Sequence, residues 1–161
     1  MLKLIKISIL SLALVTTLAS TPVPTQVDYS LKFAYSEYNC MKVALWHEAR
    51  GESIRGIHAV ASVIINRTKH KDYPSTICEV IKQPRQFQRI DLAFKRGITA
   101  YNASERQALA RVQQVAFEAV YTGFKPSVEA LSYHVVGHGV YWSKYLSKRV
   151  KIDRHIFGSV V

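Results

Sequence analysis

Two carboxylates and an arginine lie close together in the run from Trp46 to Glu52, where one helical pattern ends and another begins. Glu48 falls at the end of the first pattern, beside the apolar ring of Trp46. The negative end of a helix dipole and apolar surroundings both favour a protonated carboxyl group, so we expect the pKa of Glu48 to be raised. Such an acid can protonate the leaving oxygen of a glycosidic bond. The alternative is a solvated carboxylate paired with Arg50 or Arg55.

Two predicted helices position this carboxylate, and Gly51 supplies the backbone freedom between them. In the first helix, four side chains recur at the spacing of one helix face: Cys40, Val43, Ala44 and His47. Ser53 suits the N-cap of the second helix, which runs to about Asn66 or Arg67. Its apolar stripe comprises Ile54, Ile57, Ala61, Ile64 and Ile65.

Three further helices are expected after the second one, two short and one long. Ser75 can cap a short helix that ends near Ile81, and one more short helix is expected at about 91–96 within an irregular segment. Ser104 and Gln107 form a capping box for a longer helix that ends before Gly123.

The C-terminal third has a strand-like pattern. Residues 131–136 predict a strand, Gly137 to Gly139 can turn the chain, and residues 140–142 can return as the partner strand. Residues 150–157 predict a third strand. The fold class is therefore α+β, mainly helical with a small antiparallel sheet toward the C-terminus.

The chain of 161 residues has the length of one domain, and its hydrophobic content of 48% is enough for a packed core. Residues 1–19 combine a basic start with a weakly apolar stretch, which predicts a signal peptide or a releasable signal anchor. Residues 20–36 contain Pro22 and Pro24 and are interpreted as a linker to a folded domain at 37–161. We expect export to the periplasm or to the extracellular cell wall.

The formal net charge is +11, and +9 would remain after loss of Lys3 and Lys6 with the leader. A basic surface attracts polyanions. For an exported chain, anionic wall polymers or a membrane surface are the expected partners, because no RNA-binding pattern of interleaved aromatic residues accompanies the basic clusters. We expect a monomer that binds no nucleic acid.

The sequence contains two cysteines, Cys40 and Cys78. In an oxidising compartment they can form one disulfide between the first helix and the segment after Pro74. Two buried free thiols are the alternative, because the spacing alone does not give the geometry.

The motif from Ala44 to Glu52, followed by Gly56 and the run from Ala59 to Arg67, resembles the SleB-type cell wall hydrolases, also called spore cortex-lytic enzymes. Further similar segments follow in the order of that family: Tyr73 to Cys78, Gln86-Phe87, Ala130 to His134 with Trp142, and His155 to Phe157. The resemblance covers roughly residues 38–158.

The resemblance implies a lysozyme-like fold and cleavage of the peptidoglycan glycan strand between N-acetylmuramic acid and N-acetylglucosamine. It also implies that Glu48 is the catalytic acid. Members are described as lytic transglycosylases or as muramidase-type hydrolases, and a hydrolase usually needs a second carboxylate. Glu52 is a secondary candidate for that role, although we expect it to cap the second helix. A transglycosylase needs no cofactor and no metal, and this is the activity we predict.

Five further residues are candidates for substrate binding: Gln86, Phe87, Tyr133, His134 and Trp142. Gln86 can hydrogen-bond an N-acetyl group, and Phe87 or Trp142 can stack on a sugar ring. Tyr133 and His134 alternate on a strand, so we expect only one of them to line the cleft. His155 is expected to be structural.

Two other classes of function stay open. A zinc amidase would use His134, His138 and His155 as ligands and Glu48 as base, although Gly137 disturbs the helical spacing that such ligands need. A basic module without catalysis would only adhere to wall or membrane. The biological setting also stays open among a phage lysis enzyme (endolysin), a bacterial remodelling enzyme and a secreted wall degrader.

Overall fold

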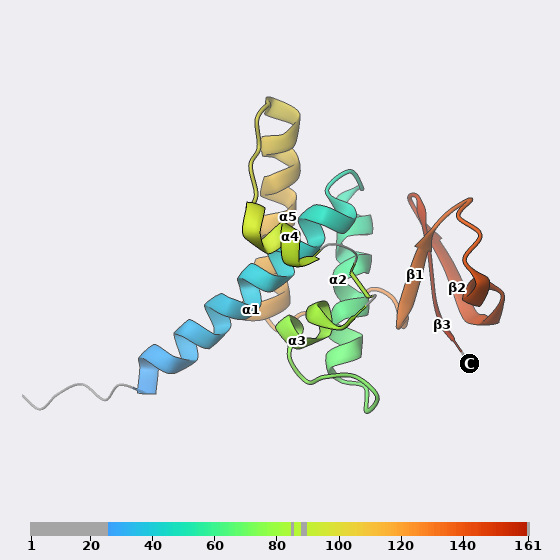
Figure 1. The fold of residues 1–161 in the computed structure, drawn as a ribbon, viewed down its shortest axis with the longest axis horizontal. Coiled ribbons are helices and arrows are strands. Elements are labelled where there is room, and N and C mark those ends of the chain that lie inside the picture. The colour runs from blue at the N-terminus through green and yellow to red at the C-terminus, as the bar shows by residue number, and fades with distance from the viewer. Residues whose placement is uncertain (1–25, 85, 88–89, 161) are drawn as a thin grey trace, which may run out of the picture.

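The computed structural model describes residues 26–84, 86–87 and 90–160, so the predicted leader at 1–19 lies outside the described residues. Over the described residues, five α-helices precede a three-stranded antiparallel sheet (Figure 1). The elements are α1 (Gln26–Ala49), α2 (Ile54–Thr68), α3 (Ile77–Lys82), α4 (Ile90–Arg96), α5 (Ala103–Tyr121), β1 (Ser132–Val135), the 3-10 helix η1 (Tyr141–Tyr145), β2 (Leu146–Ile152) and β3 (His155–Val160). The predicted α+β class is confirmed.

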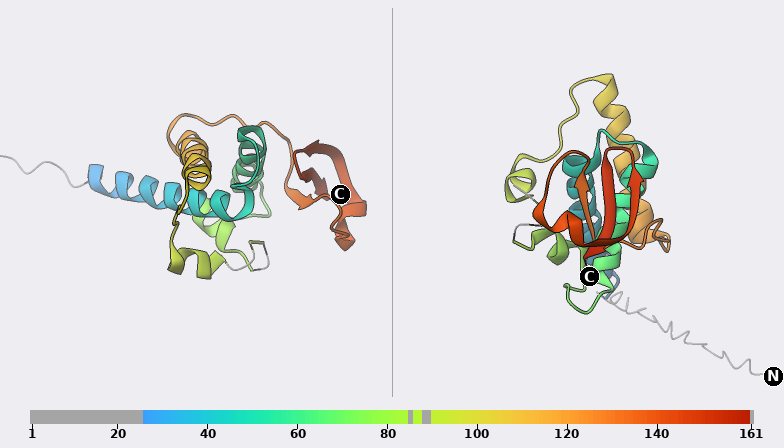
Figure 2. Two further views of the ribbon diagram at one scale, coloured as in Figure 1. Left: turned by 90° about the horizontal axis from the view of Figure 1, so that it is seen from above. Right: turned by 90° about the vertical axis from the view of Figure 1, so that its right-hand side faces the viewer.

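The core lies between α1, α2 and α5, which pack against one another. Met41 and Leu45 of α1 and Ile57 and Ile64 of α2 are fully buried there. The sheet lies beside the helical part as a separate layer, and β1 and β2 pack against α2 (Figure 2). Phe157 is the fully buried residue of β3. The site described below lies between these two layers.

Two of the predicted helix starts are shifted. Ser53 is the N-cap of α2, as expected, and its side chain accepts a hydrogen bond from the backbone N–H of Gly56. By contrast, α3 is capped by Thr76, one residue after Ser75. The cap of α5 is Asn102, two residues before Ser104, because the Asn102 side chain accepts from the N–H of Glu105. Several residues near a helix start can cap it, so the pattern locates the cap only approximately.

Helix α1 is longer than predicted and includes residues 26–36 of the segment interpreted as a linker. No glycine or proline interrupts residues 26–49. Once a packed segment has nucleated a helix, adding further residues to its end costs little free energy, even when those residues are polar. Among the side chains described in α1, Glu37 is the first that is buried. The linker role of residues 20–36 stays a prediction.

The sheet differs from the predicted pairing. Its order is β1-β3-β2, so β1 pairs with β3, and Tyr133 lies opposite Phe157. Residues 141–145 form η1, which corrects the predicted return strand at 140–142. The predicted third strand at 150–157 is divided by a tight turn at Asp153 and Arg154. Aromatic and β-branched residues favour strands locally, but pairing partners are chosen by distant contacts.

The turn between β2 and β3 lies against the start of α2. The carboxylate of Asp153 accepts hydrogen bonds from the backbone N–H (2.9 Å) and the hydroxyl (2.6 Å) of Ser53. A Cβ at Gly56 would overlap the Asp153 carboxylate and would lie 2.8 Å from the Cβ of Glu52. The absence of a side chain at Gly56 therefore allows this close approach.

Cys40 of α1 and Cys78 of α3 form a disulfide, with 5.3 Å between their Cα atoms. The sequence left this pairing open, and the alternative of two free thiols is wrong. Next to the disulfide, the buried carboxylate of Glu37 accepts hydrogen bonds from the backbone N–H groups of Ile77 (2.6 Å) and Cys78 (3.3 Å). These contacts attach α3 to α1. Within the described residues, no helix combines the length and the apolar character needed to cross a bilayer.

Candidate active site

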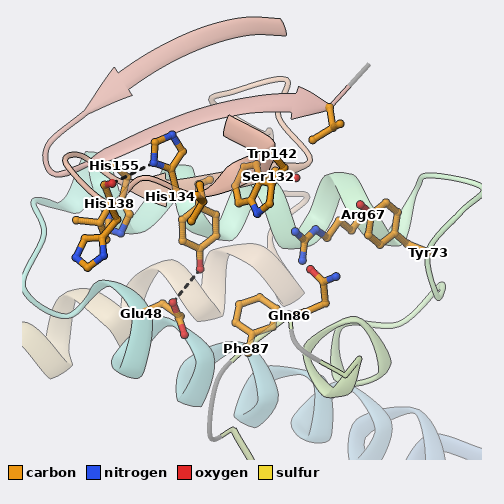
Figure 3. Close-up of a pocket in the computed structure, with 14 residues that line it drawn as sticks. Glu48, Arg67, Tyr73, Gln86, Phe87, Ser132, His134, His138, Trp142 and His155 are labelled. Carbon is orange, nitrogen blue, oxygen red and sulfur yellow. Dashed lines mark hydrogen bonds between the residues drawn. The ribbon is translucent and has the colours of Figure 1, made fainter. Parts of the chain in front are cut away.

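A cavity of about 620 Å³ lies between the helical part and the sheet (Figure 3). The end of α1 contributes Glu48, the end of α2 contributes Arg67, and β1 contributes residues 132–135. The remaining lining residues come from loops, η1 and β3: Tyr73, Gln86, Phe87, His138, Val140, Trp142, His155 and Val160. Segments far apart in sequence therefore meet at one site.

Glu48 lies in the last turn of α1 and faces the cavity, as the sequence predicts for an acid. Burial raises the pKa of Glu48, and the hydrogen bond from Tyr133 offsets part of this increase. The ion pair with Arg50 or Arg55, which was the alternative for Glu48, is not observed among the described residues. Arg50 instead donates to the carbonyl of Trp46 and lies over its ring. Burial thus shifts the pKa of Glu48 in the direction that the sequence predicts for an acid.

Tyr133 projects from β1 toward α1, and its hydroxyl donates a hydrogen bond of 3.2 Å to Oε2 of Glu48. The ring packs beside Phe157 and edge-on against His155, with centroids 5.6 and 5.3 Å away. Burial and the neighbouring Glu48 raise the pKa of Tyr133 well above its ordinary value. The hydroxyl therefore stays protonated and can donate to either form of Glu48.

The structure brings all five predicted substrate-binding residues to the cavity, but not equally. Tyr133 and His134 both line it, which corrects the expectation that only one would. Their side chains alternate, but β1 is a short edge strand, so the cavity reaches both of its faces. Trp142 is half-buried and packs edge-on against His134, and Gln86 is exposed. Phe87 is only 4% exposed and belongs to the core, so little of its ring remains for a sugar.

Glu52 does not line the cavity. Its buried carboxylate accepts hydrogen bonds from the backbone N–H of Arg154 (3.2 Å) and from the guanidinium of the same residue (Nε, 2.8 Å). The expected capping of α2 by Glu52 is wrong, because Ser53 and Asp153 occupy that helix start. Nδ1 of buried His155 lies 4.0 Å from Glu52, and burial lowers the pKa of His155. Glu52 thus supports the turn between β2 and β3.

Arg67 is the main cavity residue that the sequence did not single out as a candidate. It stands three positions after Ile64, on the apolar face of α2, and is 6% exposed. A charged residue in line with an apolar stripe is unusual, and this feature of the sequence could have identified Arg67 as a candidate. Tyr73 and Ser132 also line the cavity, but no comparable feature of the sequence pointed to them.

The ligands proposed for the alternative zinc site, His134, His138 and His155, all line the cavity. Within residues 26–84, 86–87 and 90–160, however, no group of three or more His, Cys, Asp or Glu side chains is arranged to hold a metal ion. The described donor geometry therefore gives this alternative no support.

Comparison with known families gives one match over most of the chain. Residues 51–158 match the family described as Cell Wall Hydrolase. Two curated spore cortex-lytic enzymes are similar over 131 residues, that of Oceanobacillus iheyensis at 30% identity and that of Bacillus subtilis at 29%. These alignments cover 78% of this chain but only 42% and 38% of the two relatives. The chain thus spans less than half the length of the curated relatives it matches.

Two solved structures have a similar fold. The catalytic domain of the germination-specific lytic transglycosylase SleB from Bacillus anthracis has a TM-score of 0.54 at 28% identity, covering 76% of this chain and 93% of that domain. The catalytic domain of the Bacillus cereus SleB protein has a TM-score of 0.55 at 28% identity, covering 77% and 90%. These likenesses confirm the predicted lysozyme-like fold.

Proposed function

This chain belongs to the cell wall hydrolase family, and from that membership we propose that it cleaves the peptidoglycan glycan strand as a lytic transglycosylase. The bond cleaved would join N-acetylmuramic acid to N-acetylglucosamine. The names of the similar proteins support this choice, since one solved relative is a lytic transglycosylase and the curated relatives are cortex-lytic enzymes.

One observation carries the choice between transglycosylase and hydrolase. Among the described residues that line the cavity, Glu48 is the only carboxylate. A glycosidase of the retaining or inverting type uses two carboxyl groups on either side of the bond. Glu52, the secondary candidate, is held by Arg154 outside the cavity. A mechanism that needs one carboxylate therefore fits this site best.

In the proposed mechanism, protonated Glu48 transfers its proton to the glycosidic oxygen while the bond from that oxygen to C1 of muramic acid breaks. The resulting carboxylate then accepts the proton of the muramic acid C6 hydroxyl as O6 bonds to C1. The products are a shortened glycan and a 1,6-anhydromuramic end. No water is consumed, and Glu48 regains its proton for the next cycle.

Tyr133 supports both steps of this mechanism. Its hydroxyl donates to Oε2 of Glu48, so it can stabilise the carboxylate that forms after the first proton transfer. We further propose that Trp142, Gln86 and His134 contact the sugars, because each lines the cavity and keeps part of its surface accessible.

We also propose that the chain acts outside the cytoplasm, where peptidoglycan lies. The disulfide between Cys40 and Cys78 supports this location, since such bonds persist in oxidising compartments. A leader at 1–19, a catalytic domain at 37–161 and a monomeric state complete this proposal.

Mass spectrometry of digested, purified peptidoglycan tests the function. We expect wild-type protein to release fragments that end in 1,6-anhydromuramic acid, with or without EDTA. Glu48→Gln should lower their formation at least ~100-fold, because the amide cannot supply a proton. Reducing-end muramic acid would instead indicate hydrolysis, and freed stem peptides would contradict glycan cleavage.

A further inference from the structure

Arg67 is a charged residue that is almost completely buried, and burying a charge without a partner lowers stability. Its side chain is 6% exposed, and its Nε donates to the carbonyl of Leu131 at 2.7 Å. The guanidinium carbon lies 5.2 Å from the ring centroid of Tyr73 and 6.0 Å from that of Phe87. The backbone contact links α2 to the segment before β1, and the guanidinium carbon lies over both aromatic rings.

None of the described carboxylates balances this charge. Among the described residues, no ion pair includes Arg67, and no hydrogen bond joins its terminal nitrogens Nη1 and Nη2 to a described residue. Glu48, the carboxyl group in the same cavity, accepts a hydrogen bond from Tyr133 and forms no ion pair with Arg67, and burial raises its pKa. An unpaired buried charge is costly unless a ligand supplies the missing acceptor.

The position of Arg67 suits a ligand that also reaches Glu48. In Figure 3 the two side chains lie toward opposite ends of the cavity, and the guanidinium points into the space between Trp142 and Gln86. A saccharide that spans the cavity can therefore present its reacting bond to Glu48 and an acidic substituent to Arg67.

We propose that Arg67 binds a carboxylate carried by the glycan substrate and thereby selects strands that contain muramic acid. This inference rests on the proposed function. Guanidinium groups match carboxylates with two parallel hydrogen bonds, which suits the two terminal nitrogens of Arg67, for which no hydrogen bond to a described residue is found. N-acetylglucosamine is neutral, whereas muramic acid bears a lactyl group that ends in a carboxylate or continues into a stem peptide with carboxylates of its own.

Binding to the inactive Glu48→Gln protein, measured by calorimetry, tests the inference. Three ligands of equal sugar number are compared: a neutral N-acetylglucosamine oligomer, an alternating oligomer with free lactyl carboxylates, and the same oligomer with stem peptides. We expect at least one acidic ligand to bind ~10-fold or more tightly than the neutral ligand. Which of the two acidic ligands shows this preference identifies the lactyl group or the stem peptide as the source.

Adding Arg67→Gln should remove the preference and leave binding of the neutral ligand within ~2-fold. Arg55→Gln is the matched control, because Arg55 lies exposed on the same helix and does not line the cavity. It should keep the preference. Equal weakening of neutral and acidic ligands by Arg67→Gln would indicate a structural role and would overturn the inference.

Amidation of the ligand gives a test that does not depend on the folding of the Arg67 variant. Converting the preferred ligand's carboxylates to amides should reduce its affinity to that of the neutral oligomer. Unchanged affinity after amidation, or equal affinity for the acidic and neutral ligands from the start, would overturn the inference. If the wild-type protein still cleaves peptidoglycan, the proposed function would stay intact. Carboxylate-dependent binding without any cleavage would instead support the inference and contradict the proposed function.

Discussion

At the residue scale, the proposed chemistry depends on a proton held by Glu48. Burial raises its pKa, and the hydrogen bond from Tyr133 lowers it in part, because a donor stabilises the carboxylate more than the acid. These opposing influences suit the two tasks that the proposed mechanism gives Glu48, to hold a proton for the first step and to accept one in the second. We therefore expect Tyr133 to set the pH range in which Glu48 acts as the proposed acid.

Replacing Tyr133 by phenylalanine tests this adjustment. Without the hydroxyl, the pKa of Glu48 should rise further, so the acid stays protonated to higher pH and the basic limb of the kcat/KM profile moves to higher pH. Activity at the optimum should fall roughly 10-fold, because the carboxylate intermediate loses a charged hydrogen bond. Glycan cleavage measured across a pH series checks both effects.

Tyr101→Phe serves as the control for Tyr133→Phe, since Tyr101 is 82% exposed and does not line the cavity. Its pH profile should match that of the wild-type protein. A basic limb that stays in place or moves to lower pH in Tyr133→Phe would contradict the assigned role of the hydroxyl.

At the element scale, the start of α2 holds the sheet in position. Asp153 bonds Ser53, and Glu52 bonds Arg154, so both residues of the turn between β2 and β3 are attached to the segment that begins α2. Strand β3 pairs with β2 on one side and with β1 on the other. Because Tyr133 lies on β1, this attachment also helps to position Tyr133 at the cavity. The contact is tight at Gly56.

Gly56→Ala should therefore destabilise the protein, although alanine normally favours a helix interior over glycine. The added Cβ would overlap the Asp153 carboxylate, and we expect a loss of about 1–3 kcal/mol in the free energy of unfolding. Gly139→Ala, where an added Cβ meets no atom within 4 Å, should stay within about 0.5 kcal/mol. Urea denaturation distinguishes the two, and a more stable Gly56→Ala protein would show that the turn moves away freely.

At the scale of the whole molecule, the disulfide between Cys40 and Cys78 fixes α3 to α1. Helix α3 leads into the loop that brings Gln86 to the cavity, so the bond contributes to one wall of the site. The buried carboxylate of Glu37 strengthens the same junction by accepting from the first N–H groups of α3.

Replacing both cysteines by alanine should lower the free energy of unfolding by about 2–4 kcal/mol, because the bond closes a separation of 38 residues in the unfolded chain. Chemical denaturation with and without a reducing agent measures this effect. The reductant should destabilise the wild-type protein and leave the double variant unchanged. Equal stability of the oxidised wild-type protein and the variant would contradict the expected contribution.

The sequence by itself determined the features that depend on neighbouring residues. The apolar spacing in α2 and its cap at Ser53 are confirmed, and Glu48 lies at the helix end where its surroundings favour the acid. Side chains within one or two turns of each other decide periodicity and helix ends, so these features are readable from a short window. The family motif pointed to the same residue.

Only the tertiary structure decided which distant residues meet. Tyr133 reaches Glu48 across 85 positions, and Arg67 meets the carbonyl of Leu131 across 64. Strand pairing, the disulfide and the bonding of Glu52 to the turn at Arg154 also depend on such contacts. Local propensity does not specify them, because the partner of a strand or of a buried charge is selected by how the whole chain packs.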